Sequence, residues 1–485
     1  MRGFTFMALI AILAMGITGC TKPADEGKIP ITTSSDEARK EFLQGREIAE
    51  KLQITNSLQH LDKAIALDSN FATAYLYRAL SSITAKDFFF YQGKAVALKE
   101  KCSEGERLLI LAVEAGTNAN IAKQKEYLDK LVVLFPKDER VRLNLGNYYF
   151  GQQEYIKAIE QYNKVTEIAP NFSPAYNILG YAYRQIENYA ESEKAFKKYI
   201  ELIPNDPNPY DSYAELLLKV GRFDESIANY QKALTADPNF VSSHVGIAAN
   251  YMYKGDIDSG SAQLKKLTAI TRNDGEKRQA LFTQMVLYID AGKMDLALKE
   301  LEKQYELGEK TNDVAAMSAD CGFKGAILLE TGKYDEALSA FAKSEQLIAS
   351  SGLSQEIKNV AQLFLHFNRA DAAVLKKDLK KAKAETNEFR KVAEAAGNAN
   401  QIRYGHELLG KIAFVEKNYN MAIEELLKAN QQDPYNLYRL ALSYQAKGDN
   451  AKAKEFCKKA AKSNGLPSLN YAFIRMKAEK LLTVL

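Results

Sequence analysis

The stretch PNFSPAYNILGYAYRQIENYAESEKAFKKYIELIP (170–204) runs directly into PNDPNPYDSYAELLLKVGRFDESIANYQKALTADP (204–238), and the two align at a period of 34 residues. Each unit has a small residue at positions 8 and 20, an aromatic residue or leucine at positions 11 and 24, and proline at position 32. Position 8 of four successive units is occupied by Gly146, Gly180, Ala214 and Ala248. A fixed period of this length is typical of an array of repeated helical units.

The spacing of these residues has a mechanical cause. Two helices of about a dozen residues fit within one period, and small residues where the helices cross let the two backbones approach closely. Gly221, just past the first helix, suits the left-handed conformation that ends many helices. Pro238 cannot continue the second helix and therefore sets the turn into the next unit. The pattern predicts antiparallel helix pairs.

These units resemble the tetratricopeptide repeat. The resemblance implies an all-α fold, a right-handed α-solenoid of antiparallel helix pairs that winds into a superhelix. We count about twelve units between Ala38 and Gly465. Units of the 34-residue type form residues 37–272, and residues 273–466 form an array with longer units, similar to those of kinesin light chain. Residues 467–485 are expected to form a C-terminal capping helix, because the end of a solenoid needs a polar outer face.

The first residues have the features of a secretion signal. Arg2 precedes about fourteen mostly apolar residues, a length that fits a signal peptide and is too short to span a bilayer. The run ends in the sequence ITGC, residues 17–20, which resembles the lipobox of bacterial lipoproteins. The resemblance implies that residues 1–19 are removed and that Cys20 is acylated, which gives a stable membrane anchor. Residues 20–36 are expected to form the lipidated cysteine and a flexible tether.

The residue after the lipidated cysteine bears on where such a lipoprotein is sent. Here Thr21 follows Cys20, where aspartate would favour retention in the inner membrane. The resemblance therefore implies a lipid-anchored protein of the bacterial cell envelope, at the outer membrane, with the mature chain on the periplasmic or surface side.

Composition and charge argue against a nucleic-acid partner. The formal net charge is +4, and the excess of lysine lies toward the C-terminus, on what we interpret as the solvent faces of helices. No aromatic residues interleave those lysines, as a nucleic-acid platform would need. The cysteines Cys20, Cys102, Cys321 and Cys457 have neither metal-ligand nor redox-motif spacing, and Cys457 is expected at a core position.

We find no catalytic motif, and so we expect no enzyme activity, no catalytic residues, no metal site and no cofactor. The four histidines are scattered, and none belongs to an HExxH pattern or lies near a cysteine pair. Residues 405–411, GHELLGK, are similar to a phosphate-binding loop, but Ile412 stands where that loop needs serine or threonine. Gly410 is interpreted instead as the small position 8 of its repeat.

In tetratricopeptide repeats the first helix of each unit lines the inner, concave surface through positions 2, 5, 9, 12 and 13. The resemblance implies that these positions form a groove for a protein or peptide partner. In three successive units they include Arg140, Asn147, Asn177, Tyr181, Arg184, Asp211 and Glu215. The clamp with which some relatives hold a C-terminal carboxylate is not matched, because Leu143 and Ile178 replace its lysine and one of its asparagines.

Two functions of different class remain open. The favoured one is a non-catalytic protein–protein interaction scaffold or assembly factor, anchored to the membrane as a lipoprotein. The alternative is a glycan-binding outer-membrane lipoprotein that is accessory to a transporter. Glycan platforms rely on tryptophan, which the chain lacks, although its 27 tyrosines could substitute.

Four consecutive aromatic residues, Phe88 to Tyr91, lie near an expected helix–helix turn. One hypothesis is that they pack beneath the less regular units of residues 72–138. The other is that they form an exposed hydrophobic contact surface.

Overall fold

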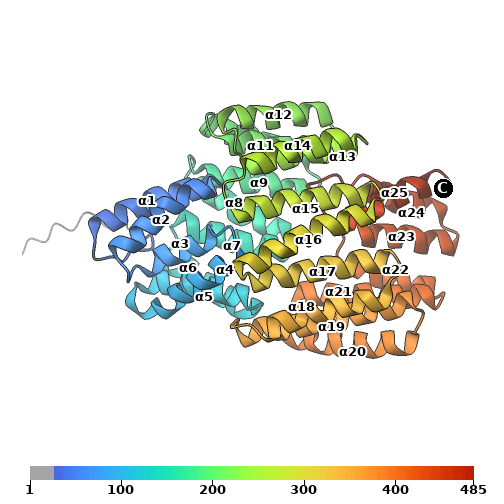
Figure 1. The fold of residues 1–485 in the computed structure, drawn as a ribbon. Helices are drawn as coiled ribbons and strands as arrows, with labels where there is room; N and C mark the ends of the chain where they lie inside the picture. The colour runs from blue at the N-terminus through green and yellow to red at the C-terminus, as the bar shows by residue number, and fades with distance from the viewer. Residues whose placement is uncertain (1–26) are drawn as a thin grey trace, which may run out of the picture.

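The computed structural model describes residues 27–485. The expected signal peptide and Cys20 lie outside the described residues. Within residues 27–485 the chain forms twenty-five α-helices and no strands, and consecutive helices pack against one another as pairs (Figure 1). The expected all-α solenoid is thereby confirmed. Each consecutive pair is a unit, numbered 1 to 12 from the N-terminal end, and a single helix follows unit 12.

Units 1 to 7 are built from helices of 9 to 15 residues. Their pairs are α1 (Asp36–Glu50) with α2 (Ile54–Leu67), α3 (Ala72–Leu80) with α4 (Ala85–Ala97), α5 (Glu104–Thr117) with α6 (Ile121–Leu134), α7 (Glu139–Gly151) with α8 (Tyr155–Ile168), α9 (Ser173–Gln185) with α10 (Tyr189–Leu202), α11 (Pro207–Lys219) with α12 (Phe223–Ala236), and α13 (Val241–Tyr253) with α14 (Ile257–Ile270). A short 3-10 helix, Lys99–Lys101, follows α4.

Units 8 to 12 complete the array. Their pairs are α15 (Asp274–Asp290) with α16 (Met294–Thr311), α17 (Val314–Glu330) with α18 (Tyr334–Ala349), α19 (Gln355–Leu375) with α20 (Leu379–Ala396), α21 (Ala399–Val415) with α22 (Tyr419–Lys428), and α23 (Pro434–Lys447) with α24 (Asn450–Ala461). Helices α15 to α21 have 16 to 21 residues, whereas α22 to α24 have 10 to 14. The longer helices therefore end with α21.

The crossing of the two helices within a unit explains the sequence period. In unit 4 a Cβ atom added to Gly146 would lie 2.3 Å from the ring of Tyr162, and in unit 5 a Cβ atom added to Gly180 would lie 2.5 Å from the ring of Phe196. Both rings are fully buried. The aromatic residue at position 24 therefore fills the space that a small residue at position 8 leaves open.

The loop between the two helices of a unit repeats one backbone conformation. Gly221 has φ of +79°, as the sequence predicts for the residue after a first helix. Gln153, Glu187, Lys377 and Lys417 have φ between +59° and +63° at the corresponding place in their units. Non-glycine residues rarely adopt this region. The packing of each helix pair therefore imposes the turn even where the sequence does not supply glycine.

Successive turns of the superhelix touch each other, and α4 lies beside α17 (Figure 1). The loop within one unit lies against the start of the first helix seven units later. Hydrogen bonds of 2.8 to 3.2 Å make this contact between Thr55 and Glu276, Lys86 and Asp313, Asn118 and Ser354, and Gln152 and Arg403. Units 1, 2, 3 and 4 thus rest on units 8, 9, 10 and 11, and seven units make one superhelical turn.

The last helix, α25 (Leu469–Leu482), packs on α24 and α23 and also on α15. Arg475 donates hydrogen bonds to both carboxylate oxygens of Asp290, at 2.7 and 2.5 Å, and both side chains are buried. Lys477 forms a 2.6 Å ion pair with Glu330 at the end of α17. Helix α25 therefore joins unit 12 back to units 8 and 9.

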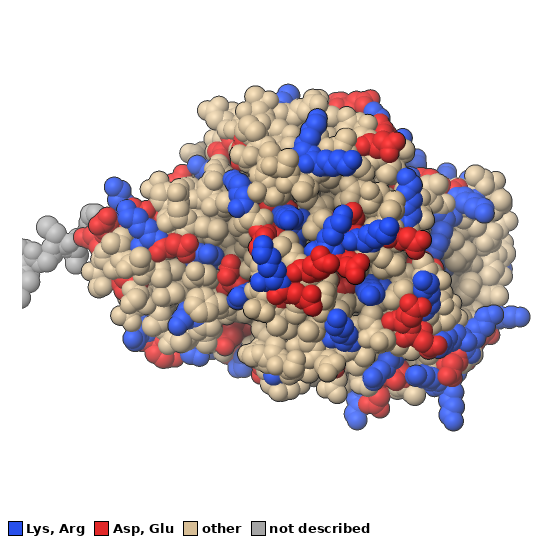
Figure 2. Space-filling model, in the orientation of Figure 1, with Lys and Arg blue, Asp and Glu red and all other residues tan. Residues whose placement is uncertain are grey.

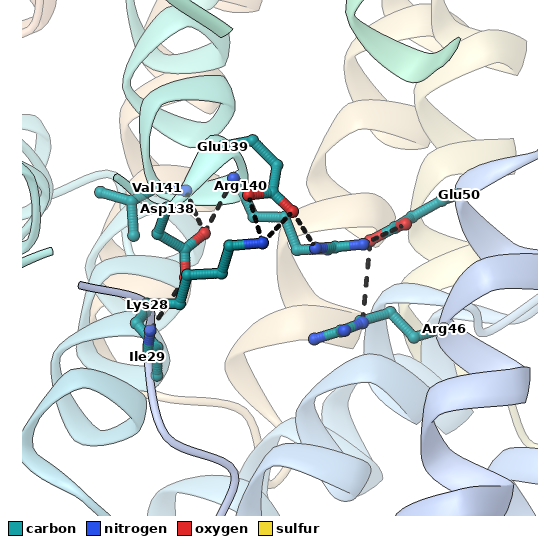
Figure 3. Close-up of polar contacts among 8 residues, drawn as sticks. All are labelled: Lys28, Ile29, Arg46, Glu50, Asp138, Glu139, Arg140 and Val141. Atoms are coloured by element: carbon teal, nitrogen blue, oxygen red, sulfur yellow. Dashed lines mark hydrogen bonds and ion pairs between the residues drawn. The ribbon is translucent and has the colours of Figure 1, made fainter. Parts of the chain in front are cut away.

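Residues 27–35 lie along the first units, and we call them the N-terminal strap. The strap has no regular secondary structure, and carboxylates on three units accept its hydrogen bonds (Figure 3 shows its first contacts). The donor and acceptor pairs are Ile29 with Asp138, Thr32 with Glu106, and both Thr33 and Ser34 with Asp68. The expectation of a flexible tether over residues 20–36 is corrected for this part, because its polar groups are bound to the repeats.

The aromatic run and the cysteines have clear places in the fold. Phe88 to Tyr91 lie on α4, where Phe90 is 56% exposed and the other three rings are half-buried, so each hypothesis holds for part of the run.

Cys457 is fully buried in the core, as the sequence predicts, and burial raises the pKa of its thiol to about 11. Cys321 is also buried, on α17.

The surface carries interspersed charge. Figure 2 shows positive and negative side chains side by side across one face of the molecule, with no large region of a single sign. Exposed lysines commonly pair with acidic residues three or four positions away, as in Lys452 with Glu455 and Lys428 with Glu424. The sequence predicts that the lysines toward the C-terminus lie on the solvent faces of helices, and Lys376 is exposed to solvent.

The crossing geometry predicts opposite effects for two Gly→Ala substitutions. Gly180→Ala should lower the free energy of unfolding by on the order of 1–3 kcal/mol, because the rigid ring of Phe196 must move. Gly93→Ala on α4 should leave it unchanged or raise it by up to about 1 kcal/mol, because nothing lies within 4 Å of its added Cβ atom. Chemical denaturation measures both; equal effects would contradict the proposed crossing.

The closure by α25 predicts a strong dependence on Arg475. Arg475→Met should lower the free energy of unfolding by about 3–5 kcal/mol, because it leaves the carboxylate of Asp290 buried and unpaired. Lys477→Met, on the same helix but half-exposed, should cost about 1 kcal/mol or less. Thermal and urea denaturation of the two variants compare the effects, and a similar small loss for both would show that α25 does not close the array through this pair.

Candidate binding site on the concave face

A cavity of about 570 Å³ lies on the concave side of units 9 to 12. Its walls are the first helices of these units, α17, α19, α21 and α23, and α25 forms one further side. The pairing of Arg475 with Asp290 holds α25 in this place. A cavity of this size is within the usual range for ligand-binding sites.

The lining residues follow the repeat. Each first helix contributes residues at the concave positions, counted from the small residue at position 8. Positions 5, 9, 12 and 13 supply Gly322, Ala326, Leu329 and Glu330 from α17, Phe367, Asp371, Val374 and Leu375 from α19, and Lys411, Phe414 and Val415 with Glu407 from α21. The cavity is therefore a direct product of four stacked concave faces.

Most of the wall is apolar or aromatic. The rings of Phe367 and Tyr404 meet edge to face with their centroids 5.3 Å apart, and Phe473 of α25 faces into the same space. Burial raises the pKa of Tyr404, so its hydroxyl stays neutral and can serve as a hydrogen-bond donor. Such a wall favours apolar side chains in a bound partner.

A chain of ion pairs crosses the wall. Lys411 lies 2.6 Å from a carboxylate oxygen of Asp371 and 3.2 Å from Glu407. Arg439 donates to Glu407 at 2.9 Å, and its guanidinium group covers the ring of Tyr435 at 3.9 Å from the centroid. These charged groups already neutralise one another, so the cavity does not select for a strongly charged ligand.

One carboxyl group at the edge of the cavity is perturbed. Burial, and next the negative charge of Glu407, raise the pKa of Asp433. Asp433 also caps α23, where its side chain accepts the backbone N–H of Tyr435 at 2.8 Å, and it accepts a 2.7 Å hydrogen bond from Asn470 of α25. These bonds connect α25 to the cavity wall.

The groove residues predicted in units 4 to 6 are mostly paired with one another or with the rest of the chain. Arg140 forms a bidentate pair with Glu50 of α1 at 2.6 and 2.9 Å and also contacts Glu139 (Figure 3). Asn147 is exposed, and its side-chain oxygen accepts the Tyr162 hydroxyl at 2.9 Å. Arg140 therefore ties unit 4 to unit 1.

Units 5 and 6 bring the remaining predicted residues together. Tyr181 and Arg184 both donate to the carboxylate of Glu215, at 2.9 and 3.1 Å. Asp211 is buried and accepts a 2.6 Å hydrogen bond from Ser243. Asn177 is buried on the same face of the preceding unit. Tyr181, Arg184 and Glu215 thus bind one another, and Asp211 binds Ser243, whereas the side-chain oxygen of the buried Asn177 has no hydrogen-bond partner among the described residues.

The residues that line the cavity of units 9 to 12 were missed by the sequence prediction. The concave positions were read only in units 4 to 6, where the 34-residue period is clearest. The same positions counted from Gly410 give Tyr404, Glu407 and Lys411, and counted from Ala370 give Phe367 and Asp371. The irregular lengths of these units obscured the signal, which was present at the small residues.

The buried carboxyl group of Asp211 predicts a pH effect on stability. Burial, and next the negative charge of Glu215, raise its pKa well above the usual value, although the Ser243 hydroxyl opposes this. The folded state therefore binds a proton more tightly than the unfolded state, and stability falls as the pH rises above about 4 toward neutral.

Asp211→Asn should raise the free energy of unfolding at neutral pH by on the order of 1 kcal/mol and flatten its decline with pH. The matched control is Asp224→Asn, whose side chain is exposed in the same unit, and it should change neither quantity measurably. Urea denaturation between pH 5 and 8 provides the measurement. A loss of stability in Asp211→Asn across this range would contradict the assignment.

Some of these repeats match a known protein family. The model of the tetratricopeptide repeat family matches residues 139–172, 173–206, 208–240 and 435–465. No curated protein matches the chain. A tetratricopeptide repeat protein from Parabacteroides merdae is 15% identical over 54% of this chain and 98% of its own, with a TM-score of 0.36.

Two further solved structures are similar over different lengths. A chain of the APC/C hetero-tetramer Cut9-Hcn1 is 14% identical over 87% of this chain and 76% of its own, with a TM-score of 0.41. YrrB, described as a tetratricopeptide repeat protein with an unusual peptide-binding site, is 19% identical over 37% of this chain and 91% of its own, with a TM-score of 0.26. The matched segments of the family model coincide with units 4, 5, 6 and 12. These four units match the tetratricopeptide repeat family, and the other units share their paired-helix architecture.

Proposed function

We propose that this protein is a non-catalytic scaffold, anchored to a bacterial envelope membrane through lipidated Cys20, that binds a peptide segment of a partner protein in the concave cavity of units 9 to 12. Tetratricopeptide repeats generally serve as protein-interaction scaffolds, which supports the proposed scaffold function. The single observation that supports the proposed peptide site is the cavity of about 570 Å³ formed by four successive concave faces.

The chemistry of the wall specifies the kind of segment. Its volume accommodates a few large side chains rather than a whole helix. Aromatic and aliphatic groups dominate the wall, and the charged groups within it, such as Lys411 and Glu407, are already paired. The occupant is therefore a short segment, extended or helical, that inserts aromatic or leucine side chains and leaves its backbone near the polar rim.

The anchor rests on the sequence of residues 1–20. The apolar run and the sequence ITGC resemble a lipoprotein signal, and Thr21 favours the outer membrane. Within residues 27–485 no helix is long and apolar enough to cross a membrane. A lipid at Cys20 would hold the folded array at the membrane surface.

Glycan binding is the alternative function. Sugars stack on the open faces of aromatic rings, and the cavity contains Phe367, Tyr404 and Tyr435. However, the guanidinium group of Arg439 covers the face of Tyr435, and the ammonium group of Lys411 lies 5.7 Å from the centroid of Phe367. Covered ring faces favour the insertion of a peptide side chain over the stacking of a sugar.

A glycine in the wall provides the test. Gly322 lines the cavity, and nothing lies within 4 Å of a Cβ atom added to it, so a larger side chain fits there and fills the cavity. Gly322→Phe should weaken the binding of peptides selected from a displayed random library by about tenfold or more, without lowering the melting temperature. The affinities are measured by titration calorimetry with the full chain.

Gly93→Phe is the matched control, because Gly93 also lies in a helix with open space around it but does not line the cavity. It should bind the selected peptides as the unmodified protein does. Selection of no peptide, or equal binding by Gly322→Phe, would overturn the proposed peptide site. Binding of an oligosaccharide that Gly322→Phe abolishes would favour the glycan alternative instead.

A further inference from the structure

The N-terminal strap follows the units in reverse order. It leaves α1 and contacts Asp68 at the end of unit 1, then Glu106 at the start of unit 3, and finally Asp138 at the start of unit 4. Each contact lies at a turn between units. The strap therefore carries the chain from α1 back to the first turn of α7, three units along the array.

Several interactions hold the strap at its far end. The N–H of Ile29 donates to Asp138 at 2.9 Å, and Lys28 forms a 3.2 Å ion pair with Glu139 (Figure 3). The side chains of Ile29 and Phe135 both pack against the core of units 2 to 4. Glu139 is itself bound by Arg140, which reaches Glu50. The strap is thus fixed by backbone, charged and apolar contacts together.

The position of this end limits where a lipid on Cys20 can lie. Gly27 lies against Lys137, in the turn between α6 and α7. Only seven residue steps separate Gly27 from Cys20, so even a fully extended chain reaches no more than about 25 Å. The turn between α6 and α7 must therefore stay close to any membrane that holds the lipid.

Exposed apolar side chains lie at this turn and at the corresponding turns after α2 and α8. Val133 and Leu134 end α6 with 78% and 46% of their surface exposed, and Ile168 at the end of α8 and Leu67 at the end of α2 are exposed as well. Lys137 is exposed as well, three residues after Leu134 in the sequence. Apolar side chains next to lysine suit the boundary between lipid headgroups and acyl chains.

We propose that the turns after α2, α6 and α8 form the membrane-facing edge of the protein, which the strap presses against the lipid bilayer that carries its anchor. This inference rests on the proposed lipidation of Cys20 and adds the orientation of the folded array. Val133, Leu134 and Ile168 contact the lipid, and Lys137 contacts its anionic headgroups. The array is then held by one edge and does not swing freely about a tether.

The absence of tryptophan from the chain makes the test direct, since a single introduced tryptophan is the only one present. Val133→Trp and the control Leu427→Trp both place it at an exposed site near the end of a second helix, in units 3 and 11. The full-length lipidated proteins are incorporated into vesicles of phosphatidylethanolamine and phosphatidylglycerol with bromine-labelled acyl chains. Flotation reports anchoring, and quenching of tryptophan emission reports contact with lipid.

We expect both proteins to float with the vesicles and the emission of Val133→Trp to be quenched several-fold more than that of Leu427→Trp. If both proteins float but are quenched equally, or Leu427→Trp is quenched more strongly, the proposed membrane-facing edge is wrong. The lipid anchor would be unaffected by that result. Failure of the proteins to float would overturn the lipid anchor and this inference with it. Cys20→Ala in each background should abolish flotation, which shows that the lipid provides it.

Discussion

The contact between a small residue and a larger side chain at the crossing of two helices is the constraint on which the structure depends. Gly146 faces Tyr162 and Gly180 faces Phe196 so closely that even a Cβ atom would collide. This contact sets the distance between paired helices, and its repetition sets the rotation from one unit to the next. A constant rotation brings each unit above the unit that lies seven places earlier. Contacts such as that between Lys86 of unit 2 and Asp313 of unit 9 therefore recur from one unit to the next.

The regular winding divides the concave face into two regions with different chemistry. In units 5 and 6 the inner side chains bind one another, as Tyr181 and Arg184 do through Glu215. In units 9 to 12 the longer helices and the closure by Arg475 of α25 leave a cavity between aromatic walls. The same concave positions therefore give a cluster of largely paired polar side chains in one half and a cavity with aromatic walls in the other.

The sequence was sufficient for the fold because the crossing contact is local. Small residues such as Gly180 and the larger side chains packed on them recur at a fixed spacing in the 34-residue units, and the small residues mark the longer units as well. The cavity could not be foreseen in the same way, because it depends on the return of α25 to α15, a contact between Arg475 and Asp290 that no short-range pattern records. The docking of the strap on Asp138 was missed for the same reason, since its composition resembles a free tether.

If the proposed function is right, the partner binds in the cavity of units 9 to 12 and not on the inner face of units 5 and 6. Photo-reactive residues placed separately at Gly322 and at Tyr181, in the native envelope, test this directly when the crosslinked segment is mapped and then synthesised. We expect a crosslink from Gly322 to a segment rich in aromatic or leucine side chains, whose synthetic peptide competes for the site. A crosslink from Tyr181 alone, to a segment that binds without regard to Gly322, would contradict it.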